Sequence, residues 1–113
     1  MSESTIKDLE RSISIAKNKI ALADALQRLQ KNTDFKTVIE QGYLTDEALR
    51  LVGLLADPNM QEDSKQASVH TQLSAISNLR AYFRISVQLA AMAEYQQTND
   101  ESTLIDVLNE REG

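Results

Sequence analysis

The sequence contains no cysteine, only one proline and only three glycines among its 113 residues. Without cysteine the chain forms neither a disulfide nor a thiolate metal site, which is weak support for a reducing compartment. Proline and glycine most often interrupt helices, whereas the helix-favouring residues alanine, leucine, glutamine, glutamate, lysine and arginine are abundant. Aromatic residues are few, and runs typical of β-strands are missing. The composition therefore predicts an all-α protein, and the length fits one domain.

Long apolar runs are missing as well. No amino-terminal stretch resembles a signal peptide, and no apolar stretch approaches the roughly 20 residues that a membrane span needs. We therefore expect a soluble protein, exposed to the cytoplasm in which it is made, with no membrane partner. A chain of this size holds only a modest core, so we also expect it to associate with copies of itself as a homo-oligomer.

The net charge of −5 comes entirely from the carboxyl-terminal part of the chain. Residues 1–93 contain 11 basic and 11 acidic side chains, whereas residues 94–113 contain six acidic side chains and one base, Arg111. The first 31 residues hold six bases and four acids, a mild bias of the opposite sign. This asymmetry favours pairing of the two ends, either within one chain or between copies.

Capping residues and helix breakers divide the chain into expected helices. Thr5 is a candidate cap for the first helix, Asn32 begins a polar break, Gly42 has the residue type that closes helices, and Pro58 stops the third helix. We expect helices at about residues 5–31, 35–41, 46–56 and 60–97, forming a helical domain of residues 1–97. A polar linker at 98–102 then opens an acidic tail, residues 98–113, with a short amphipathic helix.

The helix expected at about 60–97 organises the predicted fold, which is a helical hairpin or small bundle. Its apolar residues recur at steps of three and four, the spacing of one helix face. Thirty helical residues extend roughly 45 Å, which is longer than a compact domain of this size needs. Part of this helix should therefore protrude or pair.

Three groups of residues are candidate protein interfaces. The first helix carries a heptad-like seam, which either packs within its own domain or forms a coiled coil between subunits. On the long helix two arginines lie one turn apart beside aromatic residues; a pI near 4.8 makes nucleic acid an unlikely ligand, so they favour a protein contact. The tail helix either docks on its own body or folds on a partner. The candidates are Ile6, Leu9, Ile13 and Ile20; Arg80, Tyr82 and Arg84; and Leu104, Ile105 and Leu108.

Signatures of catalysis and of cofactor binding are missing. His70 is the only histidine, no serine lies in a glycine-flanked nucleophile turn, and there is no glycine-rich phosphate loop. Residues 57–63 alternate acidic and amide side chains like a calcium loop, but Glu62 stands at the glycine position and Ser68 at the position of the bidentate acid. We therefore expect no catalytic residue, no metal and no cofactor.

Two runs resemble proteins of a known group. Asn32–Leu44 leads into Glu47–Val52, and the second run is Leu73–Phe83. They resemble small helical virion structural and assembly proteins of tailed bacteriophages, over about Asn32 to Phe83. The resemblance implies a minor virion or assembly component that contacts capsid, portal or tail proteins in many symmetric copies. It assigns no functional residue.

The expected function is that of a non-enzymatic phage-type virion structural or head/neck assembly protein. Such a protein acts through helix–helix contacts with itself and with capsid, portal or tail proteins. It is made in the host cytoplasm and resides in the virion; the alternative location is the host cytoplasm only. The alternative is a small acidic regulator or inhibitor that occupies a basic surface of a host protein with its carboxyl-terminal end.

Overall fold

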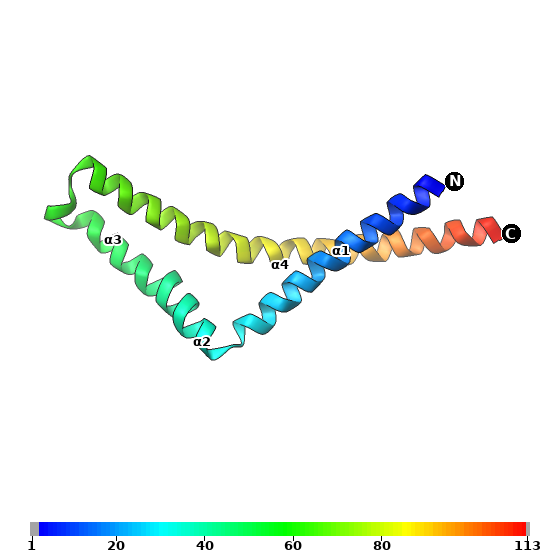
Figure 1. Ribbon diagram of the computed structural model, residues 1–113, viewed down its shortest axis with the longest axis horizontal. Helices are drawn as coiled ribbons and strands as arrows, with labels where there is room; N and C mark the ends of the chain where they lie inside the picture. The colour runs from blue at the N-terminus through cyan, green and yellow to red at the C-terminus, as the bar shows by residue number, and fades with distance from the viewer. Residues whose placement is uncertain (1–2, 113) are drawn as a thin grey trace. The chain divides into compact units, whose positions relative to one another are not determined.

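The computed structural model describes residues 3–112, and every regular element in that range is a helix (Figure 1). This confirms the predicted all-α fold with one long helix. The elements, in order, are α1 (Glu3–Gln30), α2 (Thr33–Phe35), the π-helix η1 (Lys36–Glu47), α3 (Ala48–Ala56), the 3₁₀ turn η2 (Pro58–Met60) and α4 (Asp63–Glu112).

The chain divides into two compact units, and α4 contributes to both. Unit 1 combines the chain up to Leu26 with the chain from Ile85 onward, and unit 2 is Gln27–Arg84. The division is therefore not the expected one into residues 1–97 and a tail, because the second half of α4 belongs with α1.

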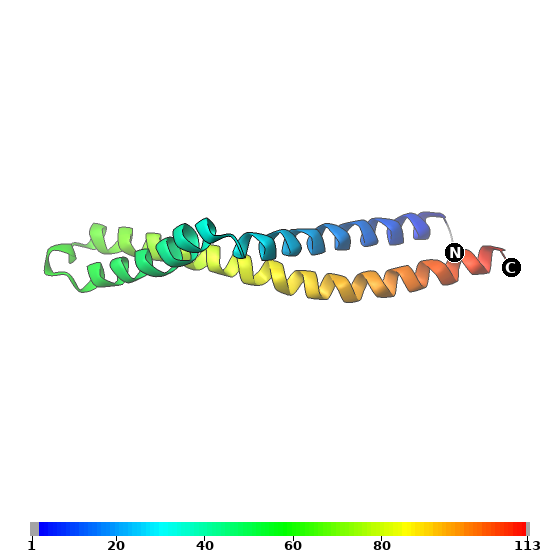
Figure 2. The same ribbon diagram turned by 90° about the horizontal axis from the view of Figure 1, so that it is seen from below.

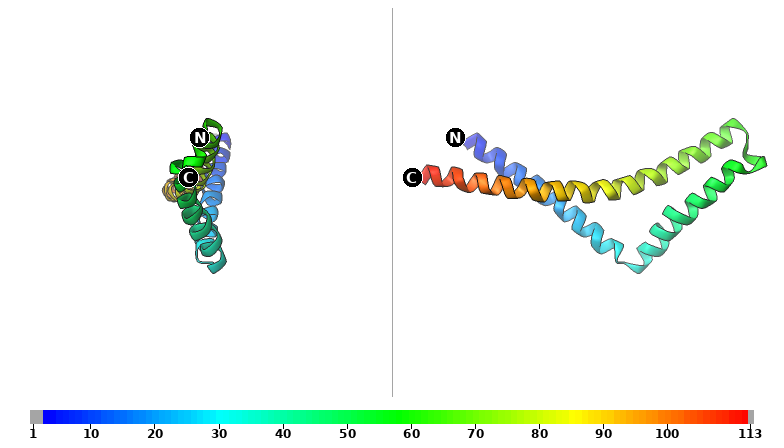
Figure 3. Two further views of the ribbon diagram at one scale, coloured as in Figure 1. Left: turned by 90° about the vertical axis from the view of Figure 1, so that its left-hand side faces the viewer. Right: turned by 180° about the vertical axis from the view of Figure 1, so that it is seen from behind.

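Unit 2 is a helical hairpin in which α2, η1 and α3 follow one another without a break and run antiparallel to the first half of α4 (Figure 3). Its core consists of Leu44 and Leu51 from one arm and of Val69 and Ile76 from α4. At the start of the first arm, the side chain of Asn32 accepts a hydrogen bond from the N–H of Phe35 at 3.0 Å, as a helix cap does.

The reversal between α3 and α4 is fixed by side-chain hydrogen bonds. The carboxylate of Asp57 accepts from the N–H of Asn59 at 2.9 Å, at the point where Pro58 stops α3. The amides of Gln61 and Gln66 both donate to the carbonyl of Leu55, at 3.0 and 3.2 Å. These bonds satisfy carbonyls that the end of α3 leaves without helical partners.

The helix end that was predicted at Gly42 is wrong, because the chain continues there as a twelve-residue π-helix. Gly42 does not take the left-handed conformation; no described glycine has a positive φ. A Cβ at this position would lie 3.1 Å from the carbonyl oxygen of Thr37, so the wide turn of the π-helix is crowded there. Glycine relieves that crowding within a helix instead of ending one.

The side chain of Arg80 binds the π-helix near the point where the chain returns to an α-helix. A π-helix bonds each carbonyl to the N–H five residues on, and an α-helix to the N–H four residues on. Where the first pattern changes to the second, one carbonyl of the last π turn is left without a helical partner. The guanidinium of Arg80, on α4, donates a hydrogen bond to the carbonyl of Leu44 in that turn. Arg80, a predicted interface residue, thus has a role inside unit 2.

The predicted linker at 98–102 is also wrong, since α4 passes through it without interruption. The polar side chains bond along the helix: Gln97 donates to the carboxylate of Glu101 at 2.9 Å, and the hydroxyl of Thr98 donates to the carbonyl of Glu94 at 3.0 Å. Pairs four residues apart support a helix, so polarity alone does not break it.

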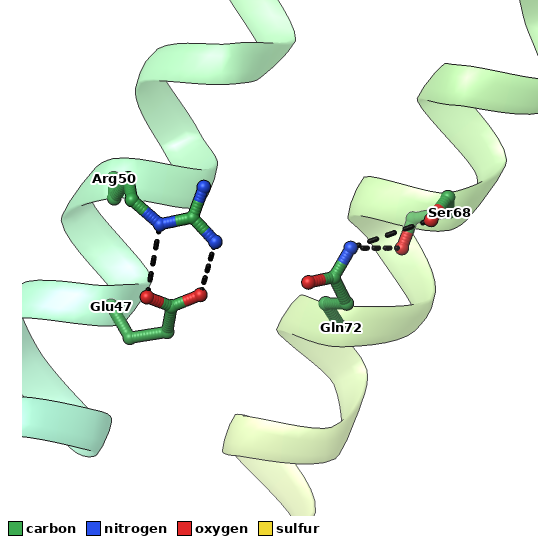
Figure 4. A network of polar contacts seen from close by, with 4 residues as sticks. All are labelled: Glu47, Arg50, Ser68 and Gln72. Carbon is green, nitrogen blue, oxygen red and sulfur yellow. Dashed lines mark hydrogen bonds and ion pairs between the residues drawn. The ribbon is translucent and has the colours of Figure 1, made fainter.

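Further polar contacts in unit 2 join residues three or four positions apart, as Figure 4 shows at the start of α3 and within α4. Arg50 donates to the carboxylate of Glu47, with Nε 3.0 Å from Oε2, and Gln72 donates to the hydroxyl of Ser68 at 3.3 Å. The hydrogen bonds from Arg50 hold the pKa of Glu47 below its ordinary value, and the same contact raises the pKa of Arg50. This stabilisation is present at neutral pH and is lost as the pH falls through the lowered pKa of Glu47.

We predict that Arg80→Met lowers the free energy of unfolding by about 1 kcal/mol, because it leaves the Leu44 carbonyl without its donor. Arg84→Met, one turn away and exposed, is the matched control and should change stability little. Urea unfolding followed by circular dichroism measures both. Equal effects of the two substitutions would show that the hydrogen bond from Arg80 to Leu44 does not stabilise the π-helix.

We predict that Gly53→Ala stabilises the protein by about 0.5–1 kcal/mol, because Gly53 lies inside α3 and a Cβ there meets nothing within 4 Å. Gly42→Ala should give less than half that gain or a loss, owing to the Thr37 carbonyl. Thermal unfolding of the two variants provides the comparison. A larger gain at Gly42 than at Gly53 would contradict the crowding described for the π-helix.

Candidate protein interface

In unit 1, α1 packs antiparallel against the second half of α4 (Figure 2). In unit 1 the buried and half-buried residues of α4, apart from half-buried Glu101, follow a seven-residue repeat of steps of four and three, as in a coiled coil. Several are small or polar, so the seam between the two helices buries little apolar side-chain volume. These residues are Ser86, Ala90, Ala93, Gln97, Asp100, Leu104 and Val107.

A polar layer fixes how the two helices meet. Asp100 is only 7% exposed, and its carboxylate accepts hydrogen bonds from the hydroxyl of Ser12 on α1 and from the amide of Gln96 at 3.0 Å. Towards the chain ends, Arg111 lies 3.5 Å from Glu3. A buried polar group that only one register can satisfy favours that register over others, as polar seam residues do in coiled coils.

The pairing of α1 with α4 also brings together the two segments of opposite charge bias. The mildly basic amino-terminal segment lies beside the acidic carboxyl-terminal segment in the same unit. Of the two possibilities, pairing within one chain is the one that the structure contains.

A groove runs along one edge of this helix pair and has a volume of about 450 Å³. Its floor is apolar: Ile15 on α1 and Leu89 and Met92 on α4 stand open to solvent, with Met92 67% exposed. The exposed side chains of Leu22 and Ile85 follow at the same heptad positions and extend the surface. We call these five residues the apolar edge.

The opposite edge of the pair has a different character. The positions of α1 that flank the seam there are all charged: Glu10, Lys17 and Asp24. On α4 two glutamates, Glu94 and Glu101, occupy the corresponding flank, between the isolated apolar residues at 87 and 108. Solvent suits a surface of this kind, so the two edges of unit 1 are not equivalent.

The predicted seam of α1 is used inside unit 1. Ile6 and Ile13 are buried, and Leu9 and Ile20 are half-buried on the same face of α1. Of the two readings of this seam, packing within the domain is therefore the one found. These residues hold together the helix pair that carries the groove.

The tail residues that were expected on a separate segment lie on the last turns of α4. Leu104 is half-buried in the seam, whereas Ile105 and Leu108 are exposed. In unit 2, Tyr82 and Arg84 are exposed on α4, and the Tyr82 ring lies 6.0 Å from that of Phe83. The structure does not bring the three predicted groups together into one site.

None of the five residues of the apolar edge is among the predicted interface residues. Ile15 and Leu22 lie seven residues apart, and Ile85, Leu89 and Met92 follow steps of four and three beside the seam of α4. A second apolar stripe next to the first widens the apolar face of a helix. Such widening is typical of helices that contact more than one neighbour, and it was the available signal.

The groove has an apolar floor with charged side chains beside it. Within residues 3–112 no group of three His, Asp or Glu side chains is placed to hold a metal ion. In the same range no helix has the length and apolar character needed to cross a bilayer. An open apolar floor beside charged side chains suits the packing of another helix, whose apolar residues would fill the groove.

We predict that Ser12→Ala lowers the free energy of unfolding by about 1–2 kcal/mol, because buried Asp100 then loses a donor. Ser14→Ala, on the exposed side of α1, is the control and should be close to neutral. In the Ser12→Ala background, Asp100→Leu should recover part of the loss, since it removes the unsatisfied carboxylate. If Ser12→Ala behaves like Ser14→Ala in urea unfolding, the polar layer does not hold the helices together.

Comparisons with protein-family models, with curated proteins and with solved structures find no match to this chain. The resemblance of residues 32–83 to small phage proteins therefore stays a prediction. The functional inference depends on the geometry of the groove and on the character of the two edges.

Proposed function

We propose that the protein is a non-enzymatic assembly protein that acts through helix–helix contacts, with the apolar edge of unit 1 as a contact surface. The observation that carries the proposal is the clustering of large aliphatic side chains on one edge only. Ile15, Leu22, Ile85, Leu89 and Met92 are between 39% and 67% exposed. Contiguous exposed apolar surface is typical of interaction sites on soluble proteins.

The energetic reason is the hydrophobic effect. Apolar surface removed from water contributes roughly 25 cal/mol for each Å². Five aliphatic side chains on one edge therefore give a partner helix a substantial driving force, while the charged opposite edge offers little. The groove between Ile15 and Met92 has the concave form that ridges of another helix require.

The setting that we propose is the assembly of a tailed phage. The resemblance of residues 32–83 to small helical phage proteins favours it, and so does the lack of any residue pattern for catalysis. In that setting the chain is made in the host cytoplasm, enters the virion in several copies, and contacts capsid, portal or tail proteins as well as itself.

The alternative, an acidic regulator that binds through a free carboxyl-terminal end, loses its main support. It required a detached acidic segment. In the structure the acidic residues lie on α4, Asp100 is bonded to Ser12, and Arg111 approaches Glu3 on α1. The segment is already engaged with its own chain.

We predict that Met92→Glu removes the protein from purified phage particles, because a charge in the groove is costly to bury. Tyr95→Glu is the matched control: Tyr95 is 73% exposed on the same helix but lies outside the groove. Quantitative mass spectrometry of particles from cells expressing each variant measures the copy number, and circular dichroism checks helix content. Wild-type protein missing from particles, or Met92→Glu present at wild-type copy number, would contradict the proposal.

A further inference from the structure

We infer that the partner at the apolar edge is the same edge of a second copy, so that two copies of unit 1 form a four-helix bundle about a two-fold axis. The inference rests on the proposed function, since it assigns the occupant of the surface named there. It is carried by three features of unit 1: the alignment of its apolar residues, the area of its face and the charges around its groove.

Three of the five residues of the apolar edge lie at one level. Ser12 contacts Asp100, and Glu3 lies near Arg111, which sets the register of the antiparallel pair. In that register Leu22 is level with about residue 91, between Leu89 and Met92. Three exposed aliphatic side chains therefore gather at one height of the helix pair.

A cluster of this kind is complementary to itself. A two-fold axis parallel to the helices, running between the two apolar edges, places Leu22 of one copy against Leu89 and Met92 of the other at the same level. Ile15 and Ile85 lie on opposite sides of that level, so each flanks the cluster in both copies. All five residues of the apolar edge would be covered in a single contact.

The size of the face agrees with a stable dimer. Residues 3–26 of α1 extend about 36 Å at 1.5 Å per residue, and two helices of about 10 Å diameter side by side give a face of about 700 Å². A stable protein interface buries about 800 Å² on each partner. One edge of unit 1 is therefore comparable to a standard interface, with an apolar centre and a polar rim.

The charges around the groove also favour a second copy over a charged partner. Asp8, Arg11 and Lys19 place both signs at the rim, so a uniformly acidic or basic partner would meet one repulsive group. Lys19 lies beside the apolar cluster, where its long stem can cover apolar atoms while its ammonium group stays in water. The opposite edge carries one base, Lys17, against four acids, Glu10, Asp24, Glu94 and Glu101, so its net negative charge would repel the same edge of another copy.

The first test is sedimentation equilibrium of the full chain over a range of concentrations. We expect twice the chain mass of 12.6 kDa for wild type. The substitutions Leu89→Glu and Met92→Glu should each raise the dissociation constant at least about a hundredfold, because a two-fold dimer contains each of them twice. Tyr95→Glu should remain dimeric. Circular dichroism at equal concentration separates loss of association from loss of fold.

The second test uses the natural lack of cysteine, which makes every introduced thiol unique. Oxidation of the double variant Leu22→Cys, Met92→Cys should give a disulfide-linked dimer, because an axis parallel to the helices brings position 22 of one copy to position 92 of the other. Lys17→Cys combined with Glu94→Cys, on the opposite edge, should remain monomeric under the same conditions. Cross-linking of both pairs to the same extent would overturn the proposed face.

The two tests separate this inference from the proposed function. A wild-type monomer at all concentrations, together with loss of Met92→Glu from particles, overturns self-docking and leaves the assembly function in place. A dimer unaffected by Leu89→Glu and Met92→Glu also overturns self-docking. A dimer that these substitutions disrupt, combined with normal entry of Met92→Glu into particles, supports self-docking and contradicts the proposed function.

Discussion

Two helices packed side by side bury only one stripe each, and this constraint governs both units of the protein. Unit 2 uses its single seam well, with Leu44, Leu51, Val69 and Ile76 in contact. Unit 1 places small and polar residues of α4 in its seam and leaves larger aliphatic residues beside it exposed. The burial that a third and fourth helix would supply is therefore missing from unit 1 alone.

Polar contacts determine which arrangement of helices is adopted. Arg80 donates to a carbonyl in the last turn of the π-helix, and Asp100 with Ser12 fixes the register of α1 on α4. Neither contact adds apolar burial, and both penalise arrangements in which their partners are lost. The apolar edge depends on the contact between Ser12 and Asp100, because Leu22, Leu89 and Met92 share one level only in this register.

The helical class, the break at Asn32 and the turn at Pro58 were predictable, since local residue chemistry determines them. The continuity of α4 through residues 98–102 was not predictable from composition. Gln97 and Thr98 are residue types common in linkers, but each is hydrogen-bonded to a residue four positions away along the helix. The helix end predicted at Gly42 was wrong because no simple sequence pattern indicates a π-helix. The candidate site needed the structure: Ile15 and Met92 are 77 residues apart, and only the register of the antiparallel pair brings them to one groove.

Hydroxyl-radical footprinting at increasing protein concentration tests the role of the apolar edge most directly. Met92 and Tyr95 are both reactive residue types, on the same helix and similarly exposed in the single chain. If the apolar edge is where copies meet, Met92 becomes protected as the concentration rises while Tyr95 keeps its reactivity. Equal reactivity of the two residues at every concentration would show that the edge stays open, and it would contradict an interface there.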